Sequence, residues 1–475
     1  MVFHRNITNS AIMKKRLRIS LLLLCFGPVS VLAQPTLTLE SFLDQVGKYH
    51  PVARQADFRI RKALGGLLSA KGIFDPEWQL TNESKTFDGS NYYRYTNSEL
   101  KIFTPLGLKI KTGLENSSGT YLDPERTEGL LTYIGIEQPV LKGLLIDKKR
   151  AALKQARLFL KLSEIEKQNL LNDLFQESLA SYWDWAGAYA EIKIVTENLE
   201  NARDRFELMK ILFANGDKSA ADTLEADLQV TSLKMDLAQI QQDYLVSAFR
   251  LSAFLWDEND EPLLLADSTI PDPGLFNNLP PLISQDSILQ FLASHPEIRK
   301  YEMKLQSLEI EKKLKKQDLL PELTLRGNIL SRDYYRIGKP LSPYLENNYK
   351  VGLSVSIPFF LRRERGALKQ THWKIRETQS QLDQKSWELV TKIRQYETEL
   401  VNQKNQIQLA EQLTKNSGHL LELEELRFQQ GESSLFIVNS RQNKQIESQV
   451  KLLKAKIKYV QTWWKQQWAA GVLYQ

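Results

Sequence analysis

The chain carries one ordered set of landmarks twice, and this internal repeat limits its architecture more than any other feature of the sequence. His50-Pro51 is followed 26 residues later by Pro76-Glu77, and His295-Pro296 is followed at the same distance by Pro321-Glu322. A repeat has to be recognised before a fold is assigned, because it means that one structural module has been built twice.

Two further landmarks recur in the same order, each shifted by 215 residues. The run Ala-Leu-Lys-Gln occupies positions 152–155 and again 367–370, and Gly216 reappears as Gly431. The repeat is therefore about 220–245 residues long and covers most of the chain. This layout directs attention to architecture rather than to a single catalytic site.

The N-terminus has the pattern of a secretory signal peptide, which we assign to residues 1–33. A basic segment at 14–18 precedes an apolar core at 19–26, and small residues at 31–33 fit a cleavage site. Met13 fits as the natural start of the chain. The apolar core is too short to cross a bilayer as an ordinary helix.

Removal of this segment changes what the net charge implies. The segment contains five basic residues and no acid, so the formal net charge falls from +6 to about +1, and the argument for a nucleic-acid partner disappears. The one cysteine of the chain, Cys25, lies in the same segment. We therefore expect no disulfide in the exported chain, whose stability must come from packing and assembly.

Each X-Pro pair of the repeat predicts the start of a helix. We expect one helix over residues 38–72 and its counterpart over 287–319, because proline is favoured in the first helical turn. We interpret the histidine before each proline as a capping or a surface residue. No metal or other cofactor is assigned, because metal-ligand spacing is absent from His50, His295, His372 and His419.

After each of these helices the composition changes to one that is typical of strands. Residues 77–140 and 322–358 are rich in Tyr, Thr, Gly, Asn and Ser, with apolar residues at alternate positions. In the second region Leu353, Val355 and Ile357 fall on one face of a strand. The pattern fits barrel strands with an apolar face towards lipid, and it equally fits a soluble hairpin with one face on a core.

The longest segments are helical hairpins, expected over about 144–256 and about 364–470. A continuous helix from Leu144 to Phe213, which contains no proline, would be roughly 100 Å long, and a compact domain has no use for such a length. Spacings of three and four between its apolar residues indicate coiled-coil packing. The seam consists of Leu171, Phe175, Tyr182, Trp185, Tyr189, Ile192, Leu199, Ala202, Phe206, Met209 and Phe213.

These segments define the expected domain organisation. The first structural repeat spans 34–256 and the second spans 287–475, and a proline-rich linker at 257–286 joins them. The repeats are unequal, because 63 residues separate Pro76 from Pro139 while the matching segment of the second repeat has 37. The surplus of 26 residues leaves room for an additional hairpin or for a longer loop.

This order of export signal, helix, strands, proline and two long helices, given twice, resembles the TolC family of outer-membrane efflux proteins. The resemblance is carried by the X-Pro helix starts, the strand start at 321–323, the strand exit at 138–143, and the hairpin turns at Gly216 and Gly431. It implies a mainly α fold with a membrane β-barrel. Duplicated long helical hairpins would form a coiled-coil tunnel, and each of three protomers would give about four strands.

The resemblance also implies a function and partners. A homotrimer in the outer membrane, with a large periplasmic part, would conduct cargo that an inner-membrane pump delivers through a periplasmic adaptor (membrane fusion) protein. A structural periplasmic coiled-coil protein without a pore is the alternative. An enzyme is disfavoured, because the exported chain has no P-loop, no Gly-x-Ser-x-Gly motif and no cysteine nucleophile.

Candidate functional residues follow from the resemblance and lie at the hairpin tips and at the strand-to-helix transitions. The family can carry two aspartates in the second tip that form an acidic gate, but Ile437 and Ser440 occupy those positions here, so the gate is not carried over. Both tip glycines are expected to be helix C-caps. The adaptor-contact candidates are Gly216, Asp217, Asp222, Gly431 and Glu432, and the barrel-to-helix transitions are expected at Pro139 and Pro358.

Overall fold

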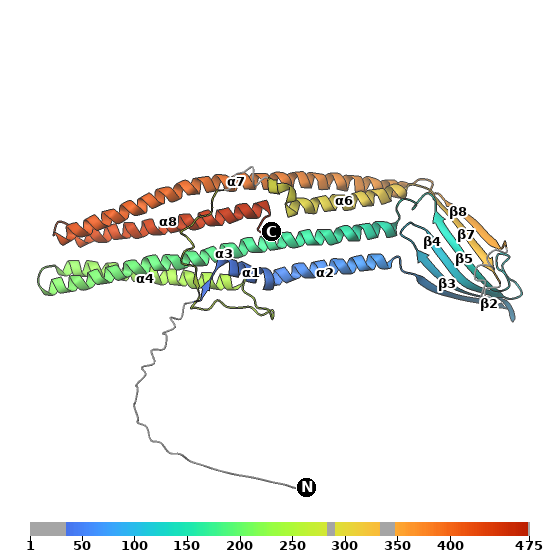
Figure 1. Ribbon diagram of the computed structural model, residues 1–475, viewed down its shortest axis with the longest axis horizontal. Coiled ribbons are helices and arrows are strands. Elements are labelled where there is room, and N and C mark those ends of the chain that lie inside the picture. The colour runs from blue at the N-terminus through green and yellow to red at the C-terminus, as the bar shows by residue number, and fades with distance from the viewer. Residues whose placement is uncertain (1–34, 283–289, 333–346, 474–475) are drawn as a thin grey trace, which may run out of the picture.

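The computed structural model of the chain describes residues 35–282, 290–332 and 347–473. The expected signal peptide at 1–33 lies outside this part of the chain. Two long helical hairpins run side by side, and one large sheet lies at an end of the helical body (Figure 1). No helix in the described ranges is both long and apolar enough to cross a membrane.

Each hairpin consists of one helix of about 100 Å and a shorter return helix. The long helices are α3 (Lys148–Ala214, 67 residues) and α7 (Arg362–Gln429, 68 residues), and the return helices are α4 (Ala220–Ser252) and α8 (Leu435–Ala470). The duplicated helical hairpins expected from the sequence are thereby confirmed. The first long helix begins after Leu144, because the Asp147 side chain caps it by accepting a hydrogen bond from the Arg150 amide.

Shorter helices lie beside the halves of α3 and α7 nearer the sheet (Figure 1). They are α1 (Leu39–Tyr49), α2 (Pro51–Gly72), the 3-10 helix η1 (Gln290–Ser294) and α6 (Pro296–Gln317). The single helix expected over 38–72 is therefore broken at His50, because the proline that follows has no N–H to continue the first helix. The expected residues 287–289 of the second helix lie outside the described ranges.

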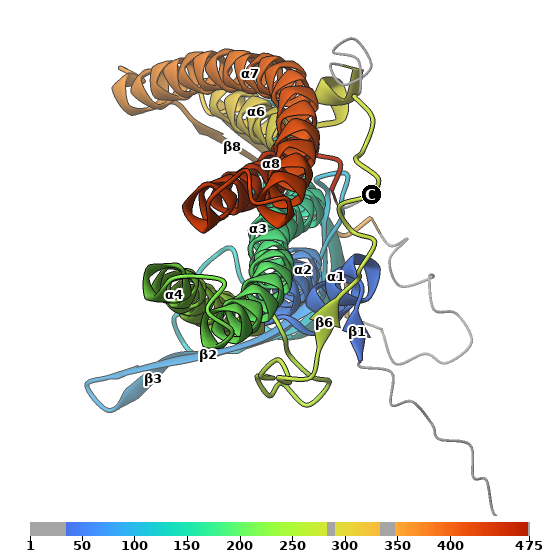
Figure 2. The same ribbon diagram turned by 90° about the vertical axis from the view of Figure 1, so that its left-hand side faces the viewer.

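The helices form a single layer that is four helices wide within the described residues. Helices α2 and α4 both pack on α3, helices α6 and α8 both pack on α7, and α3 also contacts α6 and α8. Figure 2 shows this layer from its tip end, with α4 and α7 at its two outer sides. A layer of this kind has two outer helical sides that can meet other copies of the chain.

The main core lies midway along the body, where α1, α3, α4, α7 and α8 converge. Much of the predicted seam of α3 is buried, and the buried seam residues are Leu171, Phe175, Tyr182, Trp185, Leu199, Ala202 and Met209. Phe213, at the tip end of α3, is 48% exposed. The seam is therefore buried over most of its length and exposed at the tip.

The segment between the repeats packs against this core rather than hanging free. Its strand β6 (Ile270–Pro271) pairs in parallel with β1 (Thr36–Leu37), near the start of the described chain. The buried Tyr459 of α8 donates a hydrogen bond to the Pro280 carbonyl at 2.8 Å, and Tyr182 of α3 donates one to the Leu37 carbonyl at 2.8 Å. The linker thereby ties α8, α3 and the chain start together.

Among the residues that the structure describes, the sheet contains six antiparallel strands in the order β2-β3-β4-β5-β7-β8. The strands are β2 (Glu77–Phe87), β3 (Ser90–Phe103), β4 (Lys109–Ser118), β5 (Gly129–Pro139), β7 (Glu322–Ser331) and β8 (Tyr349–Ser356). The expected number of about four strands is therefore wrong. The 26 extra residues of the first repeat account for two more strands rather than for a longer loop.

Candidate functional site

The first hairpin turn is built on a left-handed glycine. Gly216 follows the end of α3 with φ of +83°, and its amide donates to the Phe213 carbonyl at 3.0 Å. The Asp217 amide donates to the Leu212 carbonyl at 2.9 Å, which completes a Schellman cap. A Cβ at Gly216 would meet no atom within 4 Å, so the backbone conformation, and not space, requires glycine.

The second turn repeats this geometry at the positions 215 residues later. Gly431 has φ of +80°, its amide donates to the Phe428 carbonyl at 3.1 Å, and the Glu432 amide donates to the Arg427 carbonyl at 2.9 Å. Asp217 and Glu432 are therefore equivalent residues of two equivalent turns.

The return helices start differently, and Asp222 marks the difference. Ser219 and Asp222 form a reciprocal capping box at the start of α4. The start of α8 has Ser434 with no side-chain cap and Ile437 in place of Asp222. Here the 5%-exposed Glu424 of α7 accepts a hydrogen bond from the Ser433 hydroxyl instead.

A partly buried arginine, which the sequence did not single out, joins the two hairpins near their tips. Arg205 of α3 donates to Glu425 of α7 at 2.9 Å and to Gln442 and Asn439 of α8 at 2.9 and 3.2 Å. Burial lowers the pKa of Arg205, and Glu425 counteracts that shift. The sequence signal that could have identified Arg205 was a cation next to the seam residue Phe206.

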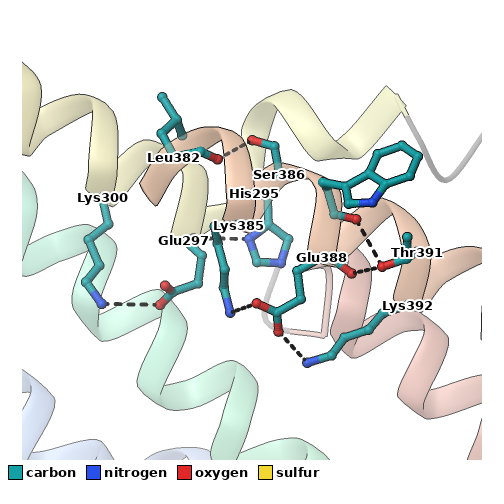
Figure 3. Close-up of polar contacts among 10 residues, drawn as sticks. His295, Glu297, Lys300, Leu382, Lys385, Ser386, Glu388, Thr391 and Lys392 are labelled. Atoms are coloured by element: carbon teal, nitrogen blue, oxygen red, sulfur yellow. Dashed lines mark hydrogen bonds and ion pairs between the residues drawn. The ribbon is translucent and has the colours of Figure 1, made fainter. Parts of the chain in front are cut away.

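Two histidines join helices end to end at the middle of the body. His50 caps α2 by accepting at Nδ1 from the Val52 amide at 3.2 Å, and His295 caps α6 by accepting from the Glu297 amide at 3.1 Å (Figure 3). Because Nδ1 accepts, the remaining ring N–H is at Nε2. The His50 ring also forms a hydrogen bond with the backbone of Ala253, just after α4. The His295 ring forms one with the backbone of Ala469 of α8.

The His295 junction should make the stability of the protein depend on pH. Burial and the neighbouring Lys385 lower the pKa of His295 to about 4, against the opposing pull of Asp173. The folded state therefore disfavours protonation of the His295 ring. The stabilisation that neutral His295 contributes is complete above pH 6.5 and is lost as the pH falls towards 4. We expect a loss of about 2 kcal/mol in the free energy of unfolding between pH 7 and pH 5.

Chemical denaturation of the purified protein at both pH values measures this loss. His295→Asn keeps an acceptor and a donor without titrating, so it should remove most of the pH dependence. The matched control is His419→Asn, because the His419 side chain is 71% exposed. An unchanged pH dependence in the His295→Asn variant would contradict a role for His295.

The two prolines expected at the strand-to-helix transitions differ in their surroundings. Pro139 is the last residue of β5, and a turn with Gly143 at φ of +86° leads from it to the Asp147 cap of α3. Pro358 lies between β8 and α7, whose N-cap Leu361 has φ of +48° and no side-chain cap.

Strand alternation gives the sheet one apolar and one polar face. Large apolar side chains on the first face are exposed, and they are Trp78, Leu80, Ile134, Ile136, Leu325, Ile329, Tyr349, Val351, Leu353 and Val355. Ile134 pairs directly with Ile329, which pairs directly with Tyr349, so this surface continues across strands. An exposed apolar surface of this extent marks contact with a membrane or a protein.

The polar face is the more shielded one. Tyr133 of β5 is 5% exposed and donates to the Glu99 carboxylate of β3 at 2.8 Å. To do so it crosses β4 at Gly113, where a Cβ would lie 2.6 Å from the Tyr133 hydroxyl. Ile134, on the other face of the same strand, is 41% exposed. The sheet therefore curls around its polar face.

A double helical hairpin about 100 Å long that carries an amphipathic sheet at one end has the architecture of an outer-membrane channel protein. The chain belongs to the outer membrane efflux protein family, which it matches over residues 108–255 and 288–465. The resemblance to the TolC family seen in the sequence is thereby confirmed.

Solved structures of outer-membrane proteins share the fold. The chain is similar to VceC from Vibrio cholerae (16% identity, 91% of this chain and 95% of that chain, TM-score 0.62). It is also similar to the outer membrane channels CmeC from Campylobacter jejuni (15%, 91% and 85%, 0.62) and MtrE from Neisseria gonorrhoeae (12%, 91% and 88%, 0.63).

A curated relative matches part of the chain. Nodulation protein T of Rhizobium leguminosarum bv. trifolii is 24% identical over 169 residues, which is 35% of this chain and 34% of that protein. The chain thus matches about a third of the length of this relative.

Proposed function

We propose that this chain is the outer-membrane channel of a tripartite export system. It would conduct small molecules or secreted substrates from an inner-membrane pump through a periplasmic tunnel and across the outer membrane. The observation that carries the proposal is the exposed apolar sheet face at one end of a helical body about 100 Å long. Lipid would cover that face, and the helices would extend into the periplasm.

The free edges of the sheet support closure by further copies of the chain. Strands β2 and β8 are the two outer strands of the sheet, and an unpaired edge is not tolerated in lipid. An even number of alternating strands means that β8 of one copy would meet β2 of the next in antiparallel orientation. The homotrimer that the family implies would then close eighteen strands, and not twelve, in a single sheet.

We further propose that the hairpin tips form the gated, adaptor-binding end. The α3–α4 turn, which contains Gly216, Asp217 and Asp222, and the α7–α8 turn, which contains Gly431 and Glu432, both lie at the end opposite the sheet (Figure 1). The Arg205 contacts would hold the two hairpins together in the closed state.

The competing classes fit the structure less well. A structural periplasmic protein without a pore would leave the apolar sheet face in water, which is unfavourable over so large an area. We propose a channel rather than an enzyme, since the family and the fold are those of channel proteins. Membrane fractionation distinguishes a channel from a structural periplasmic protein. The channel should stay in the outer-membrane fraction after a carbonate wash, as a heat-modifiable trimer.

Cysteine crosslinking tests the tip assignment, and the lack of cysteine after position 25 makes the chain a clean background. We expect Asp217→Cys and Glu432→Cys to crosslink in cells to a periplasmic adaptor protein, identified by mass spectrometry. The matched control is Asp123→Cys, because Asp123 lies in the exposed loop between β4 and β5, at the other end of the molecule. Equal crosslinking from all three positions, or only from Asp123→Cys, would refute an adaptor-binding tip.

A further inference from the structure

The loop between β4 and β5 lies at the end of the sheet that is far from the helices, because β5 leads directly towards α3 (Figure 1). We call its residues 119–128 the mouth loop. The Tyr121 amide donates to the Tyr92 carbonyl of β3 at 2.9 Å. Near the other end of the loop, the Arg332 side chain, just after β7, donates to the Glu128 carbonyl at 3.3 Å. Both ends of the mouth loop are therefore fastened to neighbouring parts of the sheet.

A turn in the mouth loop presents two side chains of opposite charge. The Asp123 carboxylate accepts a hydrogen bond from the Glu125 amide at 3.0 Å, and the Asp123 carbonyl accepts one from the Arg126 amide at 2.8 Å. A turn of this kind, in which an aspartate binds the backbone two residues on, fixes the residues that follow it. Glu125 and Arg126 therefore leave the loop from defined positions.

Arg126 reaches towards the first outer strand of the sheet. Its guanidinium carbon lies 4.0 Å from the centre of the Tyr95 ring and 5.3 Å from that of Tyr93, both on β3. Its Nη2 atom lies 3.7 Å from the carboxylate of Glu83 on β2. Glu83 pairs directly with Tyr95, which lies on the same face of β3 as Glu99. All these contacts are therefore made on the polar face.

Glu125 reaches towards the opposite outer strand. Its carboxylate lies 3.1 Å from the Nζ atom of Lys350 on β8. Lys350 pairs directly with Asn328, which pairs directly with Gly135, two residues after Tyr133. Lys350 thus belongs to the polar face as well. Because β2 and β8 are the two outer strands, the mouth loop crosses the concave polar face from side to side.

Arg126 is the firmer of the two anchors. Its side chain is 27% exposed, whereas that of Glu125 is 76% exposed. A guanidinium that stacks on aromatic rings is held more strongly than an exposed ion pair. Glu115 of β4, on the same face, lies within electrostatic range of both Arg126 and Lys350. The two cations therefore converge over the middle of the sheet.

The partners of Arg126 belong to the part of the sheet that enlarges it. Glu83, Tyr93 and Tyr95 lie on β2 and β3, before residue 108, where the match to the family begins. A closed sheet of eighteen strands would be wider than one of twelve, so its outer mouth would be wide open without a barrier. The mouth loop and its anchors lie where such a barrier would be needed.

We propose that the mouth loop narrows the outer opening of the passage at rest, so that it excludes large solutes from outside, and that outbound cargo displaces it. The inference rests on the proposed channel function. In a trimer, three mouth loops would converge on one axis. The diameter at such a constriction would then decide which solutes enter.

Labelling of a cysteine behind the mouth loop tests this proposal, since the chain has no cysteine after position 25. Ser354 is exposed on the polar face, and it lies near the end of β8 that leads to α7. Intact cells that carry Ser354→Cys are treated with a small maleimide or with a maleimide that bears a bulky polymer, neither of which crosses lipid. We expect rapid labelling by the small reagent and slow labelling by the polymer reagent.

Removal of the firmer anchor should open the mouth. Adding Arg126→Ala to Ser354→Cys should speed labelling by the polymer reagent about fivefold, with little change for the small reagent. The matched control is Ser90→Cys, because Ser90 is exposed at the turn between β2 and β3, at the outer end of the sheet. Its labelling by either reagent should not depend on Arg126.

A charge exchange separates a specific contact from general damage to the loop. Lys350→Glu places a second carboxylate opposite Glu125 and should speed polymer labelling, and the double variant Glu125→Lys/Lys350→Glu should restore slow labelling. Heat-modifiable trimers on gels check assembly. Equal polymer labelling of Ser354→Cys in all these backgrounds would overturn the mouth-loop proposal and leave the channel function intact. If even the small reagent failed to label Ser354→Cys in every background, both would be overturned.

Discussion

Val351→Arg should prevent assembly in the outer membrane, whereas Ser354→Arg, on the same strand, should not. Val351 lies on the apolar face of β8 and is 71% exposed, so the substitution places one charge per copy against lipid. An arginine facing lipid costs about 2–4 kcal/mol near the bilayer centre and less towards the interface. Three copies multiply this cost, so we expect the amount of assembled trimer to fall at least about tenfold.

The control variant differs from the first mainly in the face that it occupies. Ser354 pairs directly with Thr324 on the polar face, which already holds Arg326. Heat-modifiable trimer in washed outer membranes is the quantity to measure, with soluble antigen in the periplasm as a second readout. If Ser354→Arg were as harmful as Val351→Arg, or if both were harmless, the apolar face would not be the lipid-facing one.

Gly431→Val should abolish export while trimers still assemble. A β-branched residue is strongly disfavoured at φ of +80°, so the turn at the second tip would have to change its conformation. The altered turn lies far from the sheet, and a Cβ there meets nothing within 4 Å, so packing elsewhere should survive. Export falls because the adaptor would meet a displaced Glu432.

Gly431→Asn separates the backbone effect from the mere loss of glycine. Asparagine tolerates the left-handed conformation, so this variant should keep most of the export activity. Export is measured as cargo in the medium or as resistance to a pumped compound, next to trimer on gels. Normal export by the Gly431→Val variant would show that the tip has no role in export. Loss of the trimer would show that the turn is needed for folding instead.

Much of the fold could be predicted because its signals are local. The caps at His50 and His295, the turn glycines and the length of the helices are each written within a few residues, and the repeat shows each signal twice. The strand count could not be predicted, since a surplus of 26 residues fits a hairpin or a loop equally well. Strand pairing is settled by contacts distant in sequence, such as Tyr133 with Leu330.

The candidate site was harder to predict than the fold, because its residues come together only in the folded chain. Tyr133 and Glu99 belong to different strands, and Ile134 meets Ile329 across the boundary between the repeats. Arg205 meets Glu425 and Gln442 in the same way, more than 200 residues away in sequence. A period-two or 3.6-residue pattern reports which face a residue takes, but it does not report which partner it finds there.

The unequal division of the strands has a consequence for the width of the molecule. Three copies with four helices across would give a ring of twelve, with a perimeter of about 120 Å at about 10 Å per helix. Eighteen strands spaced about 4.8 Å apart and tilted by about 40° would give a perimeter of about 110 Å, whereas twelve strands would give about 75 Å. The two additional strands of each chain would thus let the sheet match the girth of the helical ring, so that cargo would leave through an opening as broad as the conduit behind it.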